Sequence, residues 1–144
     1  ESGETGHSFS APTSVTDLSS ACSTADVSAA VASSRVIPDR SCPATVTPPW
    51  GSVFCHTGAH IYGDEGGAPE FFGNGLRLVP VAGKNGKLEP AALEQAVHAV
   101  EGHGVHSYKP TVLSITQATE AGTVYSIEEV RALCETAHAL GMHT

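Results

Sequence analysis

From Thr47 onward, short apolar segments alternate with longer segments whose apolar residues have a helical spacing. The apolar segments have the length of buried strands; they are residues 50–55, 76–81 and 111–117. The segments with helical spacing are residues 90–101 and 127–140. Strands that alternate with helices are typical of a parallel sheet, because each crossover between parallel strands needs a connection of this kind. The chain is therefore predicted to contain an α/β layer, with a parallel-type sheet and flanking helices.

Both expected helices have recognisable ends. Pro90 suits the first turn of a helix, and the apolar positions i, i+3, i+4 and i+7 that follow are Leu93, Ala96, Val97 and Val100. Ser126 and Glu129 have the spacing of a capping box, and Gly141 has the place of the residue that follows a helix end. The Asn-Gly pair at 85–86 predicts a turn, since both residues adopt a positive φ at low cost.

Residues 1–46 differ from the rest of the chain. They contain eleven serines, and no lysine occurs before Lys84. No apolar period holds over any length there, which is typical of a low-complexity arm. A segment translated in the wrong reading frame would have the same composition, and the sequence leaves both interpretations open. We expect residues 1–46 to pack poorly and residues 47–144 to form the folded domain.

Composition restricts the partners and the compartment. The formal net charge is −8, which argues against nucleic acid and against an anionic membrane surface, since both attract clustered Lys and Arg. No apolar run has the length of a membrane span, and no signal-peptide pattern is present. The four cysteines are scattered without a C-x-x-C motif, so we expect reduced thiols and a cytoplasmic protein.

Polar residues follow the ends of the expected strands, where α/β sheets bind their ligands. His60 follows the first expected strand, and Gln117 ends the third. A single histidine is more often structural than functional. Asp64 and Glu65 also suit the first turn of a helix, where the helix dipole favours anions. From spacing alone, both interpretations stay open for these residues.

The spacing of the histidines raises the question of a metal site. His56 and His60 are four residues apart, and His103 and His106 are three apart, which suits ligands on one helix face. Glycines interrupt both segments, and no Cys or Asp completes a ligand set. We therefore expect no metal ion.

Two segments resemble the low-specificity L-threonine aldolases of the beta-eliminating lyase family. They are residues 60–72 (HIYGDEGGAPEFF) and 114–125 (SITQATEAGTVY), in this order and separation. The resemblance implies pyridoxal 5'-phosphate as cofactor and part of the large domain of the aminotransferase-like fold. It also implies that His60 stacks on the cofactor ring and takes the proton of the substrate hydroxyl group.

The same resemblance assigns three further residues. Glu65 matches an acidic position of the motif and is expected to shape the cofactor site by orienting a partner. His106 matches a second histidine near the active site, and is expected to face the same cleft as His60 and to act with it through a water molecule. Gln117 is expected to contact cofactor or substrate.

The resemblance implies a lyase that cleaves L-threonine and L-allo-threonine to glycine and acetaldehyde, and a homo-oligomer for the full-length parent. The chain breaks off before the family's Asp-Gly-Ala-Arg strand end and its cofactor-bound lysine, and no phosphate-binding turn is found. We therefore expect a fragment that is inactive when isolated. The alternatives are a non-catalytic remnant, an α/β interaction subdomain, and another beta-eliminating lyase that acts on a different amino acid.

Overall fold

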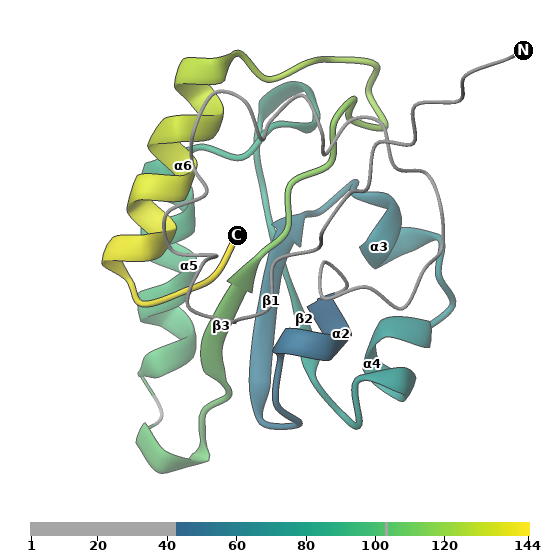
Figure 1. Cartoon of the computed structure of the whole chain (residues 1–144), viewed down its shortest axis with the longest axis vertical. Helices are drawn as coiled ribbons and strands as arrows, with labels where there is room; N and C mark the ends of the chain where they lie inside the picture. The colour runs from purple at the N-terminus through teal and green to yellow at the C-terminus, as the bar shows by residue number, and fades with distance from the viewer. Residues whose placement is uncertain (1–42, 103) are drawn as a thin grey trace, which may run out of the picture. The chain divides into compact units, whose positions relative to one another are not determined.

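A three-stranded parallel sheet lies at the centre of the part of the chain that the computed structural model describes, residues 43–102 and 104–144. Its strands are β1 (Gly51–His56), β2 (Arg77–Val81) and β3 (Lys109–Leu113), and they lie in the order β2-β1-β3. β1 runs parallel to both neighbours. The predicted α/β class with a parallel sheet and flanking helices is confirmed (Figure 1).

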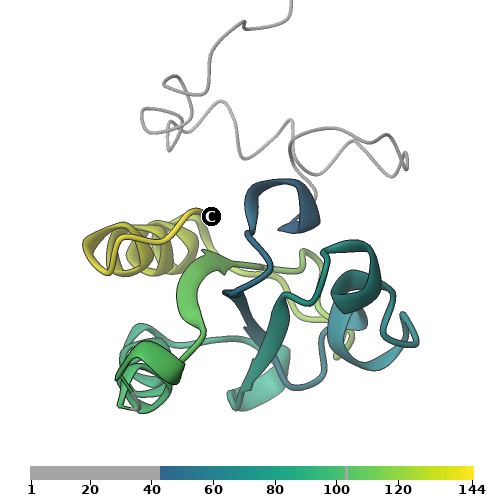
Figure 2. The same cartoon turned by 90° about the horizontal axis from the view of Figure 1, so that it is seen from below.

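Helices cover both faces of this sheet. α5 (Pro90–Glu101) and α6 (Ile127–Ala139) lie on one face, and three short helices lie on the other (Figure 2). The short helices are α2 (Pro43–Val46), α3 (His60–Gly63) and α4 (Ala68–Phe72). Two single turns of 3₁₀ helix, η2 (Lys84–Gly86) and η3 (Gly104–His106), occupy connections between the longer elements.

The central strand β1 separates two apolar clusters. Successive side chains of a strand point to opposite faces, and Val53 and Phe54 are both fully buried. Phe54 packs with Leu93 of α5 and Leu133 of α6. Val53 belongs to the second cluster, which also contains Leu78, so β1 is the only strand of this sheet enclosed by strands on both edges and by apolar clusters on both faces.

Local sequence signals fix the ends of the two long helices. α5 begins at Pro90, as predicted, and ends at Glu101. At α6, the Ser126 hydroxyl accepts from the Glu129 backbone N–H, and the Glu129 carboxylate accepts from the Ser126 N–H, so the capping box is present. Gly141 follows the helix with a φ of 73°, in the left-handed region that favours glycine.

The third strand is shorter and earlier than predicted. The sequence predicts residues 111–117, whereas β3 spans Lys109–Leu113. The Ser114 N–H still donates to Phe54 O of β1, and beyond it Gln117 bonds to Tyr125 in the segment that precedes α6. On its other edge β3 meets His143, whose N–H donates to Thr111 O and whose carbonyl accepts from Leu113 N.

The expectations for residues 1–42 lie outside the described residues. The last four residues of the expected arm are described, and they form α2, where Val46 packs against the Val53 cluster. Among the described helices, none combines the length and the apolar character needed to cross a membrane.

Candidate functional site

The segments that follow the three strands meet at the carboxyl edge of the sheet. A small pocket lies between them, lined by Ala59 after β1, by Gly86 and Leu88 after β2, and by Thr119, Glu120 and Tyr125 after β3. In parallel sheets this edge is where ligands bind. The pocket therefore lies where the sequence predicted a site.

His60 begins α3 beside this pocket, and carboxylates surround its imidazole ring. Glu65 Oε1 lies 3.2 Å from Nε2. On the other side of the ring, Asp64 Oδ2 lies 3.6 Å and Glu120 Oε1 3.8 Å from Nδ1. The side chain remains 57% exposed, so the ring is held at its edges while much of its surface faces solvent.

A second histidine fixes the turn that leads to His60. His56 Nδ1 accepts from the Gly58 backbone N–H at 3.0 Å, so its proton is on Nε2, which donates to Gly83 O at 3.1 Å. Gly83 is required there, because a Cβ atom at this position would collide with the Lys87 carbonyl group. His56 thereby ties the end of β1 to the segment after β2, and Ala59 at the start of α3 is buried.

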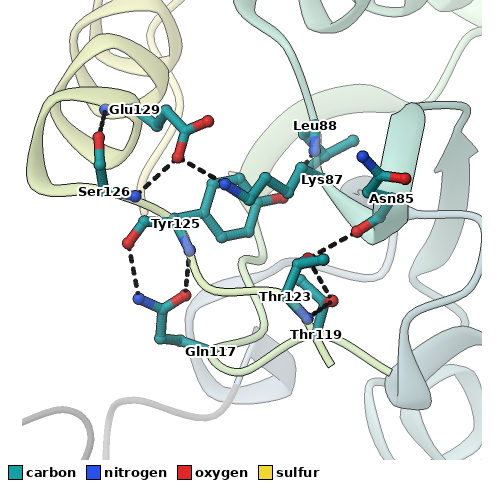
Figure 3. A network of polar contacts seen from close by, with 9 residues as sticks. All are labelled: Asn85, Lys87, Leu88, Gln117, Thr119, Thr123, Tyr125, Ser126 and Glu129. Atoms are coloured by element: carbon teal, nitrogen blue, oxygen red, sulfur yellow. Dashed lines mark hydrogen bonds and ion pairs between the residues drawn. The ribbon is translucent and has the colours of Figure 1, made fainter. Parts of the chain in front are cut away.

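The structure gives Gln117 a partner within the chain. Its Nε2 donates to Tyr125 O at 3.0 Å, and its Oε1 accepts from Tyr125 N at 2.9 Å (Figure 3). The side-chain amide thus closes the 117–125 segment in the way that a neighbouring strand would. In this structure the amide holds the segment, and the contact with cofactor or substrate expected from the sequence stays a prediction.

Two threonines close the tip of the same segment. The Thr119 and Thr123 hydroxyl oxygens lie 2.8 Å apart, and the Thr119 N–H donates to Thr123 O at 2.9 Å. The Thr123 hydroxyl also donates to Asn85 O at 2.6 Å. Gly86 packs directly against this tip, since a Cβ atom there would lie 2.7 Å from Thr119 Oγ1. Asn85 and Gly86 have φ values of 56° and 77°, so the predicted turn is confirmed.

An ion pair joins the segment after β2 to α6. Lys87 Nζ donates to Glu129 Oε2 at 2.7 Å, and the same oxygen accepts from Ser126 N at 2.7 Å. The hydrogen bond from Lys87, followed by that from Ser126, holds the pKa of Glu129 below its usual value. Lys87 also lies 5.4 Å from the centre of the Tyr125 ring, so one cation serves both neighbours.

His106 lies at the opposite edge of the sheet. It ends η3, which precedes β3. β3 runs parallel to β1, with Lys109 opposite Gly51, so residues before β3 lie at the amino edge whereas His60 lies at the carboxyl edge. The two edges are about 16 Å apart, the length of a five-residue strand. The expectation that His60 and His106 face one cleft is wrong for this fold.

Within residues 43–102 and 104–144, no three His, Cys, Asp or Glu side chains form a group that could hold a metal ion. The sequence predicted Glu65 as a residue that shapes the site but did not predict Glu120, which the structure also places beside His60. The family resemblance of residues 114–125 indicated that this segment belongs to the site. It did not indicate that Glu120 contacts His60, because the two residues are sixty positions apart.

The chain is similar to known proteins over most of the described region. Residues 41–144 match the model of a family described as Beta-eliminating lyase. Two curated relatives, low specificity L-threonine aldolases of a Pseudomonas sp. and of Pseudomonas aeruginosa, are 44% and 45% identical over 92 residues. These residues are 64% of this chain and 26% of each relative, so the chain spans about a quarter of their length.

Two solved structures are also similar to this chain. The Leishmania major threonine aldolase matches with a TM-score of 0.61 and 28% identity, over 69% of this chain and 28% of that one. An archaeal alanine:glyoxylate aminotransferase matches with a TM-score of 0.52 and 19% identity, over 69% of this chain and 23% of that one. At that identity the second likeness concerns the fold alone.

Proposed function

The chain belongs to the beta-eliminating lyase family, and we propose that it is part of a lyase that cleaves L-threonine and L-allo-threonine to glycine and acetaldehyde. The identity with low specificity L-threonine aldolases supports this substrate class. The observation that carries the proposal is the half-exposed His60 ring at the carboxyl edge of the sheet, beside a pocket and held between carboxylates.

In this proposal His60 takes the proton of the substrate β-hydroxyl group when the Cα–Cβ bond breaks. Nε2 is the accepting atom in this proposal, because the nearest carboxylate oxygen lies on that side of the ring. Glu65 Oε1, 3.2 Å from Nε2, stabilises the imidazolium that forms. Glu65 is thus a positioning residue, and His106 has no part in this step.

Pyridoxal 5'-phosphate is the cofactor that we propose, and it supplies an electron sink for the bonding pair released at Cα. The residues around His60 fit one part of this group. The flat, exposed imidazole suits stacking against a pyridine ring, whereas Asp64, Glu65 and Glu120 repel a phosphate. We therefore assign the ring face to His60 and place the phosphate away from these carboxylates.

We propose that none of the three lysines of this chain holds the cofactor. Lys109 begins β3 at the amino edge of the sheet, and Lys87 is bonded to Glu129. Lys84 begins η2, and we assign it no role in the reaction. The isolated chain is therefore expected to be inactive toward threonine.

The test mixes the purified chain with pyridoxal phosphate, follows absorbance through dialysis, and measures acetaldehyde released from L-threonine. We expect weak cofactor binding that His60→Ala reduces further, no band that survives dialysis, and no acetaldehyde above the free-cofactor background. Glu94→Ala, an exposed carboxylate of α5, is the control and should bind cofactor like the unsubstituted chain. A stable band with acetaldehyde production would contradict the assignment of the lysines. Cofactor binding that is indifferent to His60→Ala would contradict the role of His60.

We further propose a small amino-acid substrate, a cytoplasmic location and, for the full-length parent, a homo-oligomer. The buried Cys55, which forms no disulfide, fits a reducing compartment. The exposed aromatic side chains of α4, Phe71 and Phe72, fit a protein whose surface is covered further in the longer parent.

A further inference from the structure

Glu120 contacts His60 from outside the helix that carries it. The other two carboxylates beside the ring, Asp64 and Glu65, follow His60 directly in the chain, so they move together with α3. Glu120 comes from the segment after β3, and its Oε1 lies 3.8 Å from His60 Nδ1. Of these three contacts, this one alone joins α3 to the 114–125 segment.

The backbone around Glu120 is anchored on both sides. Thr119 is buried, and its backbone and hydroxyl groups bond to Thr123. Thr123 in turn donates to Asn85 O, and the tip of the segment rests against Gly86. The backbone that carries the Glu120 carboxylate is therefore held in place relative to the sheet.

The pocket lies beside this contact. Ala59, next to His60, lines it from one side, and Thr119 and Glu120 line it from the other. The side chains of His60 and Glu120 are each about half exposed. A single exposed ion pair adds little to stability. The consequence of the contact is therefore geometric, since it holds the Nδ1 edge of the ring beside the segment that lines the pocket.

We propose that Glu120 is a positioning residue for His60: held by the Thr119–Thr123 turn, its carboxylate keeps the Nδ1 edge of the ring toward the 114–125 segment. The contact itself is independent of the proposed function. Its use in proton transfer rests on that function.

The experiment reads the ring of His60 by NMR in the 144-residue chain, without cofactor, at about pH 8.5, where imidazole is ordinarily neutral. Ring ¹³C relaxation gives its order parameter, and ¹⁵N shifts report which ring nitrogen carries the proton. We expect Glu120→Ala to lower this order parameter, because the ring loses one of its contacts. We also expect the proton population to shift from Nδ1 toward Nε2.

Thr123→Val tests the anchoring, because it removes the hydroxyl bonds without touching His60. It should loosen the ring in the same direction as Glu120→Ala. Glu94→Ala on α5 is the matched control and should leave both readouts unchanged.

A ring that is unchanged in Glu120→Ala would overturn the proposal, and so would a loosened ring in Asp64→Asn alone. Loosening in Glu120→Ala without any effect of Thr123→Val would overturn the role of the turn. Because no cofactor is present, these results are separate from the cofactor titration, so failure of the proposed function leaves this test standing.

Discussion

The Tyr125 side chain joins the segment after β3 to the segment after β2. Its hydroxyl oxygen accepts from the Leu88 backbone N–H at 2.6 Å, in a buried position. Burial is the main cause that raises the pKa of Tyr125, opposed by the hydrogen bond from Leu88. The phenol therefore stays protonated over the ordinary pH range and acts as a neutral partner of the backbone.

Tyr125→Phe should destabilise the chain, because it leaves the Leu88 N–H buried without a partner. Loss of a buried partner of this kind costs about 1–3 kcal/mol. Urea unfolding measures the change, with Tyr62→Phe as the control, since Tyr62 is 46% exposed. Equal free energies of unfolding for the two variants would contradict the role given to the Tyr125 hydroxyl group.

Cys55 should be unreactive in the native chain. Burial, with a smaller effect of Glu70, raises the pKa of its thiol to about 11. Only about one thousandth of the thiol is then ionised at pH 8, and the thiolate is the reactive form. Peptide mapping after iodoacetamide treatment should show Cys55 labelled slowly in buffer and rapidly in denaturant. Rapid native labelling of this residue would show that the strand opens readily.

At the scale of the element, α6 begins with a hydrogen-bonded cap, and the Glu129 carboxylate of this cap also accepts a hydrogen bond from Lys87. The carboxylate of Glu129 accepts from Ser126 N within the cap and from Lys87 Nζ outside it. One charged group thus stabilises the start of the helix and its attachment to the segment after β2. The same helix contributes Leu133 and Ala137 to the main apolar cluster.

This arrangement predicts a pH dependence of stability. The pKa of Glu129 is lower in the folded chain than its usual value of 4.5. A carboxyl group with a lowered folded pKa contributes stability that is fully present above the usual value and is lost as pH falls through the folded pKa. The free energy of unfolding should therefore decrease below about pH 4.5 through this group.

Glu129→Gln isolates this contribution, because glutamine keeps the capping geometry but has no charge. The difference in free energy of unfolding between the chain and this variant should be constant near pH 7 and shrink toward pH 3. Glu94→Gln, on the exposed face of α5, should show no such convergence. A difference in free energy of unfolding that is independent of pH would contradict the contribution of Glu129 to the pH dependence of stability.

At the scale of the whole described region, the two faces of the sheet are covered unequally. α5 and α6 are long, whereas α2, α3 and α4 have four or five residues each (Figure 2). Phe71 and Phe72 of α4 are 78% and 74% exposed, with their rings edge to face at 5.2 Å. Adjacent exposed aromatic rings of this size are unusual on an isolated domain.

Replacing both rings, Phe71→Ser with Phe72→Ser, should lower the binding of a hydrophobic dye without unfolding the chain. Dye fluorescence and circular dichroism measure the two effects. Val124→Ser is the control, since Val124 is an exposed apolar residue without an aromatic ring. Undiminished dye binding in the double variant would mean that the apolar surface lies elsewhere.

The sequence by itself determined the structural features that depend on residues a few positions apart along the chain. The bounds of α5, the capping box at Ser126 and the positive φ of Asn85 follow from residues a few positions apart, and all were predicted. The family segments identified His60, and Glu65 lies near it because only five positions, most of them in the short helix α3, separate the two residues. Local spacing decides such features, because the interacting groups are tied together by the chain itself.

The tertiary structure decided what depends on pairing between distant segments. His106 lies away from His60 because parallel strands bring all their amino ends to one edge. Glu120 reaches His60 only through the register of β1 and β3 and the turn closed by Thr123. No local pattern encodes the positions of His106 and Glu120 relative to His60, since both depend on the pairing of β1 with β3, which lie more than fifty residues apart along the chain.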